Sequence, residues 1–81
     1  MKLIKFQRKD CTPCLMVDMF FEDKEVKPEI IDVEEQPNRA AEYGIMSVPV
    51  CVLVDDDENE VARSAGFNPA QLESLIAKLN S

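Results

Sequence analysis

Cys11 and Cys14 are the residues of this chain best suited to chemistry, and they enclose Thr12 and Pro13 in a CxxC pattern. Residues three apart in a first helical turn share a face, with their Cα atoms about 5–6 Å apart, which is within the range a disulfide requires. Closing so small a loop stabilises a fold by only about 2 kcal/mol through chain entropy. The spacing therefore favours a disulfide that opens and closes over one that only holds the fold.

Cys11 is predicted to be the attacking sulfur, because the free N–H groups and the dipole at a helix start stabilise a thiolate. Arg8 and Lys9 add to this stabilisation and Asp10 opposes it, so all three are candidates for electrostatic tuning of the site. Cys14 lies one turn later and is expected to be more buried. It would displace the reduced product from the mixed disulfide that Cys11 forms.

Composition narrows the classes of function. The 81 residues predict one small domain, and the net charge of −7 opposes binding to nucleic acids or anionic membranes. The chain has three cysteines and no histidine, so an inert or metal-binding cysteine pair is the weaker alternative. Neither a membrane-length apolar segment nor a signal-like segment is visible, which predicts the cytoplasm. In that reducing compartment a CxxC pair indicates redox or metal chemistry.

Hydrophobic patterning predicts an α/β fold in the order β-α-β-α-β-β-α, with a four-stranded mixed sheet flanked by three helices. The first two strands should be parallel because a helix connects them, and the last two can form an antiparallel hairpin. In the first helix, Met16, Met19 and Phe20 are predicted to belong to the core. The expected strands cover residues 3–6, 29–33, 50–54 and 60–64, and the expected helices cover 14–21, 37–43 and 69–79.

A CxxC pair after the first strand of a βαβ unit resembles the thioredoxin fold, over nearly the whole of residues 1–81. Val48-Pro49, just before the third strand, matches the family's cis-proline, although X–Pro bonds in general favour trans. Gly66 matches a glycine beside the family's substrate groove. The resemblance implies a dithiol–disulfide oxidoreductase that has a redox-active Cys11–Cys14 disulfide and no other cofactor or metal. Its implied substrate-binding residues are Thr12, Pro13, Val48, Pro49 and Gly66.

Two local patterns are similar to smaller groups within this superfamily. An aromatic Phe6 and a basic Arg8 before the first cysteine are similar to glutaredoxins. The stretch from Ser64 to Pro69 resembles NrdH-type redoxins, which supply electrons to ribonucleotide reductase. This resemblance implies ribonucleotide reductase as client, with a thioredoxin-reductase-type flavoenzyme as electron source. We expect the chain to be a monomer. A glutathione-dependent glutaredoxin and a non-catalytic binding module of the same fold are the alternatives, and Phe67 stands where glutaredoxins usually carry an acidic residue for glutathione.

Three residues carry open interpretations. Thioredoxins have a tryptophan directly before the first cysteine, where this chain has Asp10. Six residues before that cysteine they have a buried aspartate that accepts a proton from the second cysteine, and this chain has Lys5. Lys5 is either an exposed strand residue or a cation that reaches toward the dithiol. Cys51 is predicted to be an inert core residue, with a regulatory thiol as the alternative.

Overall fold

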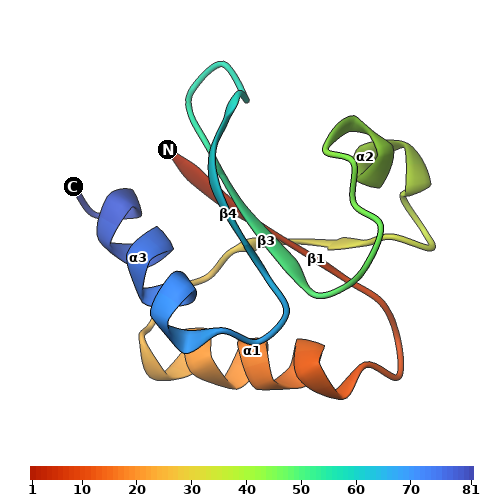
Figure 1. Ribbon diagram of the computed structural model, residues 1–81, viewed down its shortest axis with the longest axis horizontal. Coiled ribbons are helices and arrows are strands. Elements are labelled where there is room, and N and C mark those ends of the chain that lie inside the picture. The colour runs from red at the N-terminus through yellow and green to blue at the C-terminus, as the bar shows by residue number, and fades with distance from the viewer.

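The computed structural model describes residues 1–81 and contains four strands and three helices in the predicted order (Figure 1). The strands align in the order β2-β1-β3-β4. β1 is parallel to β2 and antiparallel to β3, and β3 is antiparallel to β4, so the predicted mixed sheet and its final hairpin are confirmed. The elements are β1 (Lys2–Gln7), α1 (Thr12–Asp23), β2 (Glu29–Asp32), α2 (Pro37–Glu42), β3 (Val50–Val54), β4 (Glu60–Ala65) and α3 (Pro69–Leu79).

The sheet separates two apolar cores, because successive side chains of a strand point to opposite faces. Leu3 and Leu53 pack on one face with residues from α1 and α3, whereas Ile4 and Phe6 pack on the other with Ala40 of α2. Figure 1 shows α1 and α3 on one side of the sheet and α2 on the other. This arrangement leaves the end of β1 and the start of α1 at one edge of the molecule, where the CxxC pair lies.

Only a narrow stripe of residues on helix α1 is buried, so fewer of its residues belong to the core than the sequence predicts. Cys14, Val17 and Phe21 are buried, at the three- and four-residue spacing of one helix face. Met16 is 43% exposed and Met19 is 68% exposed, so their predicted place in the core is wrong. None of the three helices is long and apolar enough to cross a membrane.

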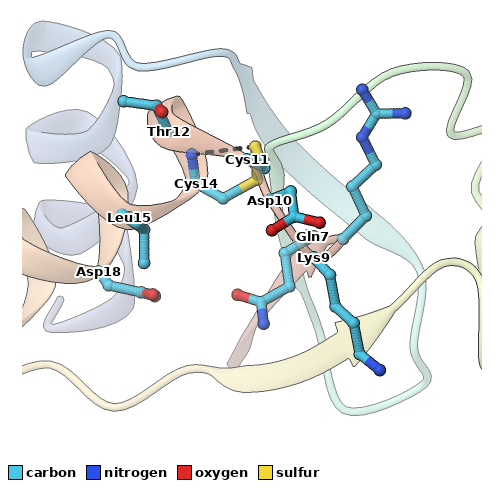
Figure 2. A pocket seen from close by; sticks show the side chains of 9 residues that line it. Gln7, Lys9, Asp10, Cys11, Thr12, Cys14, Leu15 and Asp18 are labelled. Atoms are coloured by element: carbon cyan, nitrogen blue, oxygen red, sulfur yellow. Dashed lines mark hydrogen bonds between the residues drawn. A yellow bond between two sulfur atoms is a disulfide. The ribbon is translucent and has the colours of Figure 1, made fainter.

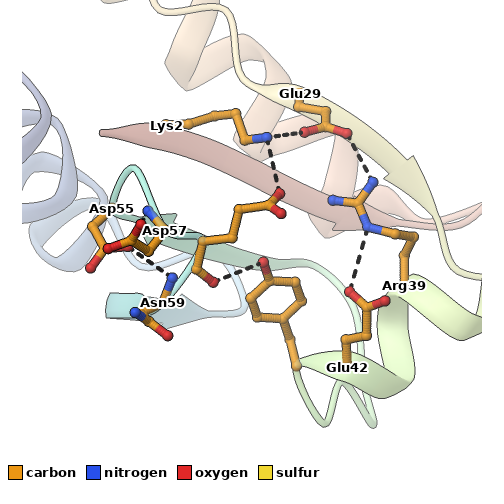
Figure 3. A network of polar contacts seen from close by, with 9 residues as sticks. Lys2, Glu29, Arg39, Glu42, Asp55, Asp57 and Asn59 are labelled. Atoms are coloured by element: carbon orange, nitrogen blue, oxygen red, sulfur yellow. Dashed lines mark hydrogen bonds and ion pairs between the residues drawn. The ribbon is translucent and has the colours of Figure 1, made fainter.

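A network of charged side chains joins β1, β2 and α2 on the surface (Figure 3). Lys2 Nζ lies 3.2 Å from Glu29 Oε1, and Arg39 Nη1 donates to Glu29 Oε2 at 3.2 Å. Lys2 also lies 3.6 Å from the carboxylate of Glu58. Burial alone would raise the pKa of Glu29, but the hydrogen bonds and positive charges of Lys2 and Arg39 outweigh it and lower the pKa.

The Glu29 contribution to stability therefore depends on pH. A carboxylate whose pKa is lowered by folding stabilises the fold fully above its ordinary pKa, and this contribution is lost as the pH falls through the lowered value. Because the pairs are exposed to solvent, we expect Glu29→Gln to lower the free energy of unfolding by less than about 1 kcal/mol near pH 7. Urea unfolding of both proteins should show this difference near pH 7 and none near pH 2, well below the ordinary carboxyl pKa of about 4.

Candidate active site

The CxxC pair lies where the chain passes from β1 into α1. Cys11 is the N-cap of α1, and Thr12 and Pro13 form its first turn. Cys11 and Cys14 are joined in a disulfide with their Cα atoms 5.2 Å apart, as the predicted helical spacing requires. The helix begins two residues earlier than predicted because Cys11 caps it.

The two sulfurs occupy different environments. Cys11 is partly exposed, whereas Cys14 is only 3% exposed and belongs to the core face of α1. The backbone N–H of Cys14 donates to Cys11 Sγ at 3.2 Å (Figure 2). Once the disulfide is reduced, this donor and the dipole of α1 act on the Cys11 sulfur and favour its thiolate. The geometry thus gives one accessible sulfur that can ionise and one sheltered sulfur beneath it.

A hollow of about 540 Å³ adjoins the disulfide. Arg8, Lys9 and Asp10 are exposed residues of the loop between β1 and α1 and line this hollow together with Thr12. The predicted tuning residues other than Lys5 are therefore brought to the disulfide. The hollow is also lined by Gln7, Cys11, Cys14, Leu15 and Asp18.

The Val48–Pro49 peptide bond is cis, as the resemblance predicted. Since Phe6 pairs with Val50, the residues just before β3 lie at the same end of the sheet as the end of β1. Gly66 has a φ of 70° and donates its N–H to the Pro49 carbonyl at 2.8 Å, so Gly66 and Pro49 are direct neighbours.

A second hollow of about 310 Å³ lies beside the first, because Arg8 lines both. Val48 lines this second hollow together with Met46 and Ser47, which are exposed. Val33 and Ile45 complete its lining. Of the predicted binding residues, Thr12 lines the hollow beside the disulfide and Val48 lines the second hollow, and the two hollows meet at Arg8. The other three, Pro13, Pro49 and Gly66, line neither hollow.

Lys5 is completely buried, so the interpretation as an exposed strand residue is wrong. Its ammonium group donates to Asp18 Oδ1 and Gln7 Oε1. Asp18 lines the hollow beside the disulfide. The hydrogen bond to Asp18 therefore connects the buried ammonium group of Lys5 to the wall of that hollow. Sequence reasoning missed Asp18, although a signal was present: it is the only polar residue between Cys14 and Glu22, four positions after Cys14.

Cys51 is buried, as predicted, on the sheet face that α1 and α3 cover. It is directly opposite Lys5 in the register of β1 and β3. Burial raises the pKa of the Cys51 thiol to about 12, and the positive charge of Lys5 offsets this only in part. Since the thiolate is the reactive form, Cys51 is both shielded and un-ionised near neutral pH.

Reaction with iodoacetamide tests this inertness. In the fully reduced, folded protein near pH 7.5, we expect Cys11 to be alkylated and Cys51 to remain free. In denaturant, Cys51 should react at the ordinary rate of a thiol whose pKa is about 8.5. Peptide mass spectrometry after both treatments would measure the difference, and native labelling of Cys51 would favour the regulatory thiol instead.

Known proteins match this chain in sequence over almost its full length. It is 42% identical over 79 residues to the SPbeta prophage-derived thioredoxin-like protein YosR of Bacillus subtilis, which covers 98% of this chain and 99% of that protein. The chain belongs to the thioredoxin family. A thioredoxin of Staphylococcus epidermidis is 36% identical over 76 residues, covering 86% of this chain and 72% of the relative. No protein-family model matches the chain.

Solved structures of the thioredoxin family match the fold as well. Malassezia sympodialis thioredoxin (Mala s 13) superimposes with a TM-score of 0.83 and 27% identity, covering 98% of this chain and 74% of that one. Family membership and the Cys11–Cys14 disulfide make the chain a thiol–disulfide oxidoreductase. The family uses its redox-active disulfide without a bound cofactor, and no group of three or more Cys, Asp or Glu side chains here could hold a metal ion.

Proposed function

We propose that the chain reduces disulfides of client proteins, with Cys11 as the attacking and Cys14 as the resolving cysteine. The observation that carries this assignment is the partly exposed sulfur of Cys11 at a helix start with the buried Cys14 beneath it. The Cys11 thiolate attacks one sulfur of the client disulfide, whose S–S bond breaks and releases one client thiolate. Cys14, as thiolate, then attacks Cys11 Sγ and releases the second client thiolate. The client gains two electrons and two protons, and the Cys11–Cys14 disulfide forms.

The client segment is proposed to lie extended beside Val48. Its backbone would pair with the backbone of Val48, as an added strand does at a sheet edge. Pro49 and Gly66 support this position, since their hydrogen bond holds the loops before β3 and after β4 together. Thr12 and Pro13 would contact the client from the first turn of α1.

Ribonucleotide reductase is the proposed client, and a thioredoxin-reductase-type flavoenzyme is the proposed electron donor. We also propose that the chain acts in the cytoplasm as a monomer. The resemblance of residues 64–69 to NrdH-type redoxins supports the client. Phe67 supports a thioredoxin-reductase-type donor over glutathione, because its side chain offers no charge to bind glutathione. Its ring packs against Phe20, with the ring centroids 6.3 Å apart. Glutathione-dependent reduction is the alternative, since Phe6 and Arg8 are similar to glutaredoxins.

Two coupled assays test these proposals. Insulin reduction is followed by turbidity, with electrons from NADPH and thioredoxin reductase in one arm and from NADPH, glutathione reductase and glutathione in the other. We expect turnover in the first arm. Turnover in the second arm alone would favour the glutaredoxin alternative, and no turnover or thiol–disulfide interconversion in either would favour a binding module. Deoxyribonucleotide formation by ribonucleotide reductase, with this chain as sole electron donor, tests the client.

A further inference from the structure

The second exchange step requires Cys14 to lose a proton, although its side chain is nearly inaccessible to solvent. The charged or titratable groups around it come from four places: Asp18 on α1, Lys5 on β1, Cys51 on β3, and the loop residues Arg8, Lys9 and Asp10. The three cations cannot accept a proton, and Cys51 is a buried thiol. Two carboxylates, Asp10 and Asp18, remain as proton acceptors.

Asp18 is preferred over Asp10 because helix α1 and the hydrogen bond from Lys5 fix its position. It follows Cys14 by four residues, so the two side chains share one face of α1, with their Cβ atoms about 5–6 Å apart. Asp10 and Asp18 both line the hollow that Cys14 lines, and the side chain of Asp18 is 37% exposed, so solvent reaches it. Asp10 lies in the exposed loop before Cys11, and Figure 2 shows its carboxylate near the disulfide, but no hydrogen bond or ion pair holds it there.

The carboxylate of Asp18 is also held in place. Lys5, at 0% exposure, donates from Nζ to Asp18 Oδ1 and to Gln7 Oε1, which leaves Asp18 Oδ2 available. In Figure 2 the side chains of Asp18 and Gln7 point toward one another from α1 and β1. Burying an ammonium group is costly unless it is paired and hydrogen-bonded, so the bond between Lys5 and Asp18 is costly to break. Because Lys5 belongs to β1, this bond fixes the orientation of the Asp18 carboxylate relative to the sheet.

We propose that Asp18 accepts the proton of Cys14 in the resolving step, directly or through a solvent molecule, and that Lys5 is its positioning residue. The proton moves from Cys14 Sγ to the carboxylate, while the electron pair stays on the sulfur and attacks Cys11 Sγ. The Cys11–client bond breaks, the client thiolate leaves with its electron pair, and Asp18 passes the proton to solvent. This inference rests on the proposed roles of Cys11 and Cys14.

Single-turnover exchange with an insulin disulfide tests the inference. Reduced protein is mixed with insulin and quenched in acid, and the mixed disulfide is counted by mass spectrometry. General base catalysis contributes about 10²–10⁴ in rate, so Asp18→Asn should resolve the mixed disulfide at least roughly 100-fold more slowly near pH 7. Near pH 10, above the ordinary thiol pKa of about 8.5, the deficit should largely disappear because hydroxide removes the proton. Asp23→Asn, an exposed change on the same helix, is the matched control and should resolve at the wild-type rate.

Each outcome decides the matter. A pH-independent deficit, wild-type resolution by Asp18→Asn, or a pH-dependent deficit in Asp10→Asn instead would overturn the inference. If the wild-type protein formed no mixed disulfide, the proposed function itself would fail, which is a distinct result. If Asp18→Asn does not fold, the double variant with Lys5→Met removes the carboxylate without leaving a buried charge unpaired, and the same pH-dependent deficit is expected of it.

Discussion

Cys11→Ser is expected to abolish insulin reduction, down to the rate measured without the protein. A serine hydroxyl at a helix start does not ionise near neutral pH, so it supplies no nucleophile for the client disulfide. Cys14→Ser should also stop turnover, but one step later, since Cys11 can still form the mixed disulfide. Non-reducing electrophoresis with a disulfide-containing client should therefore show a covalent adduct with Cys14→Ser and none with Cys11→Ser.

The matched control for these variants is Cys51→Ala, which removes the remaining thiol. In a background of Cys51→Ala, the adduct of Cys14→Ser should form in the same yield, because Cys51 is buried away from solvent. Equal trapping by Cys11→Ser and Cys14→Ser would contradict the assigned roles. Loss of the adduct in the Cys51→Ala background would instead show that the third cysteine takes part in the exchange.

The difference between the two sulfurs follows from the ends of two elements. β1 ends at Gln7, and the short loop that follows delivers Cys11 to the first turn of α1, where backbone N–H groups are free. Cys14 lies on the stripe of α1 that packs on the sheet with Val17 and Phe21. A cap position and a core position three residues apart thus separate the accessible sulfur from the sheltered one.

The bounds of helices and strands could be predicted well where the sequence has a clear boundary signal, such as a proline, an acidic turn or a helix cap. β3 has the predicted bounds of Val50–Val54, since five β-prone apolar residues lie between a proline and an acidic turn. α3 begins at Pro69 as predicted, because Asn68 caps it and accepts the N–H of Gln71 at 3.1 Å. Family resemblance, and not any local signal, predicted the cis peptide before Pro49.

Long-range contacts account for what the sequence did not predict. The apolar periodicity of α1 predicts Met16 and Met19 in the core, because it does not show how little of the helix the rest of the fold covers. Strand alternation puts Lys5 on the same face of β1 as Leu3, but its partner on α1 lies 13 residues away, at Asp18. These two side chains meet because α1 packs on the sheet beside β1, a tertiary contact that neither pattern encodes.

Removing Asp18 is expected to be much more costly to stability than removing Lys5. Asp18→Leu leaves the ammonium group of Lys5 fully buried, with Gln7 as its remaining hydrogen-bond acceptor. Breaking a buried ion pair from one side costs about 3–5 kcal/mol, and the lower end applies because solvent reaches the position of Asp18. Lys5→Met leaves a carboxylate that is 37% exposed and can be hydrated, so we expect a loss of about 1 kcal/mol or less.

Urea unfolding of the oxidised proteins measures this asymmetry. In the double variant, Lys5→Met with Asp18→Leu, no charge remains, and apolar side chains of similar volume fill the space between β1 and α1. Its free energy of unfolding should lie within about 1 kcal/mol of the wild type, since a buried ion pair is seldom more stable than a packed apolar pair. Asp23→Leu is the surface control on the same helix and should change stability by less than about 0.5 kcal/mol. Equal losses in the two single variants, with no recovery in the double variant, would show that Lys5 is not a buried charge that depends on Asp18.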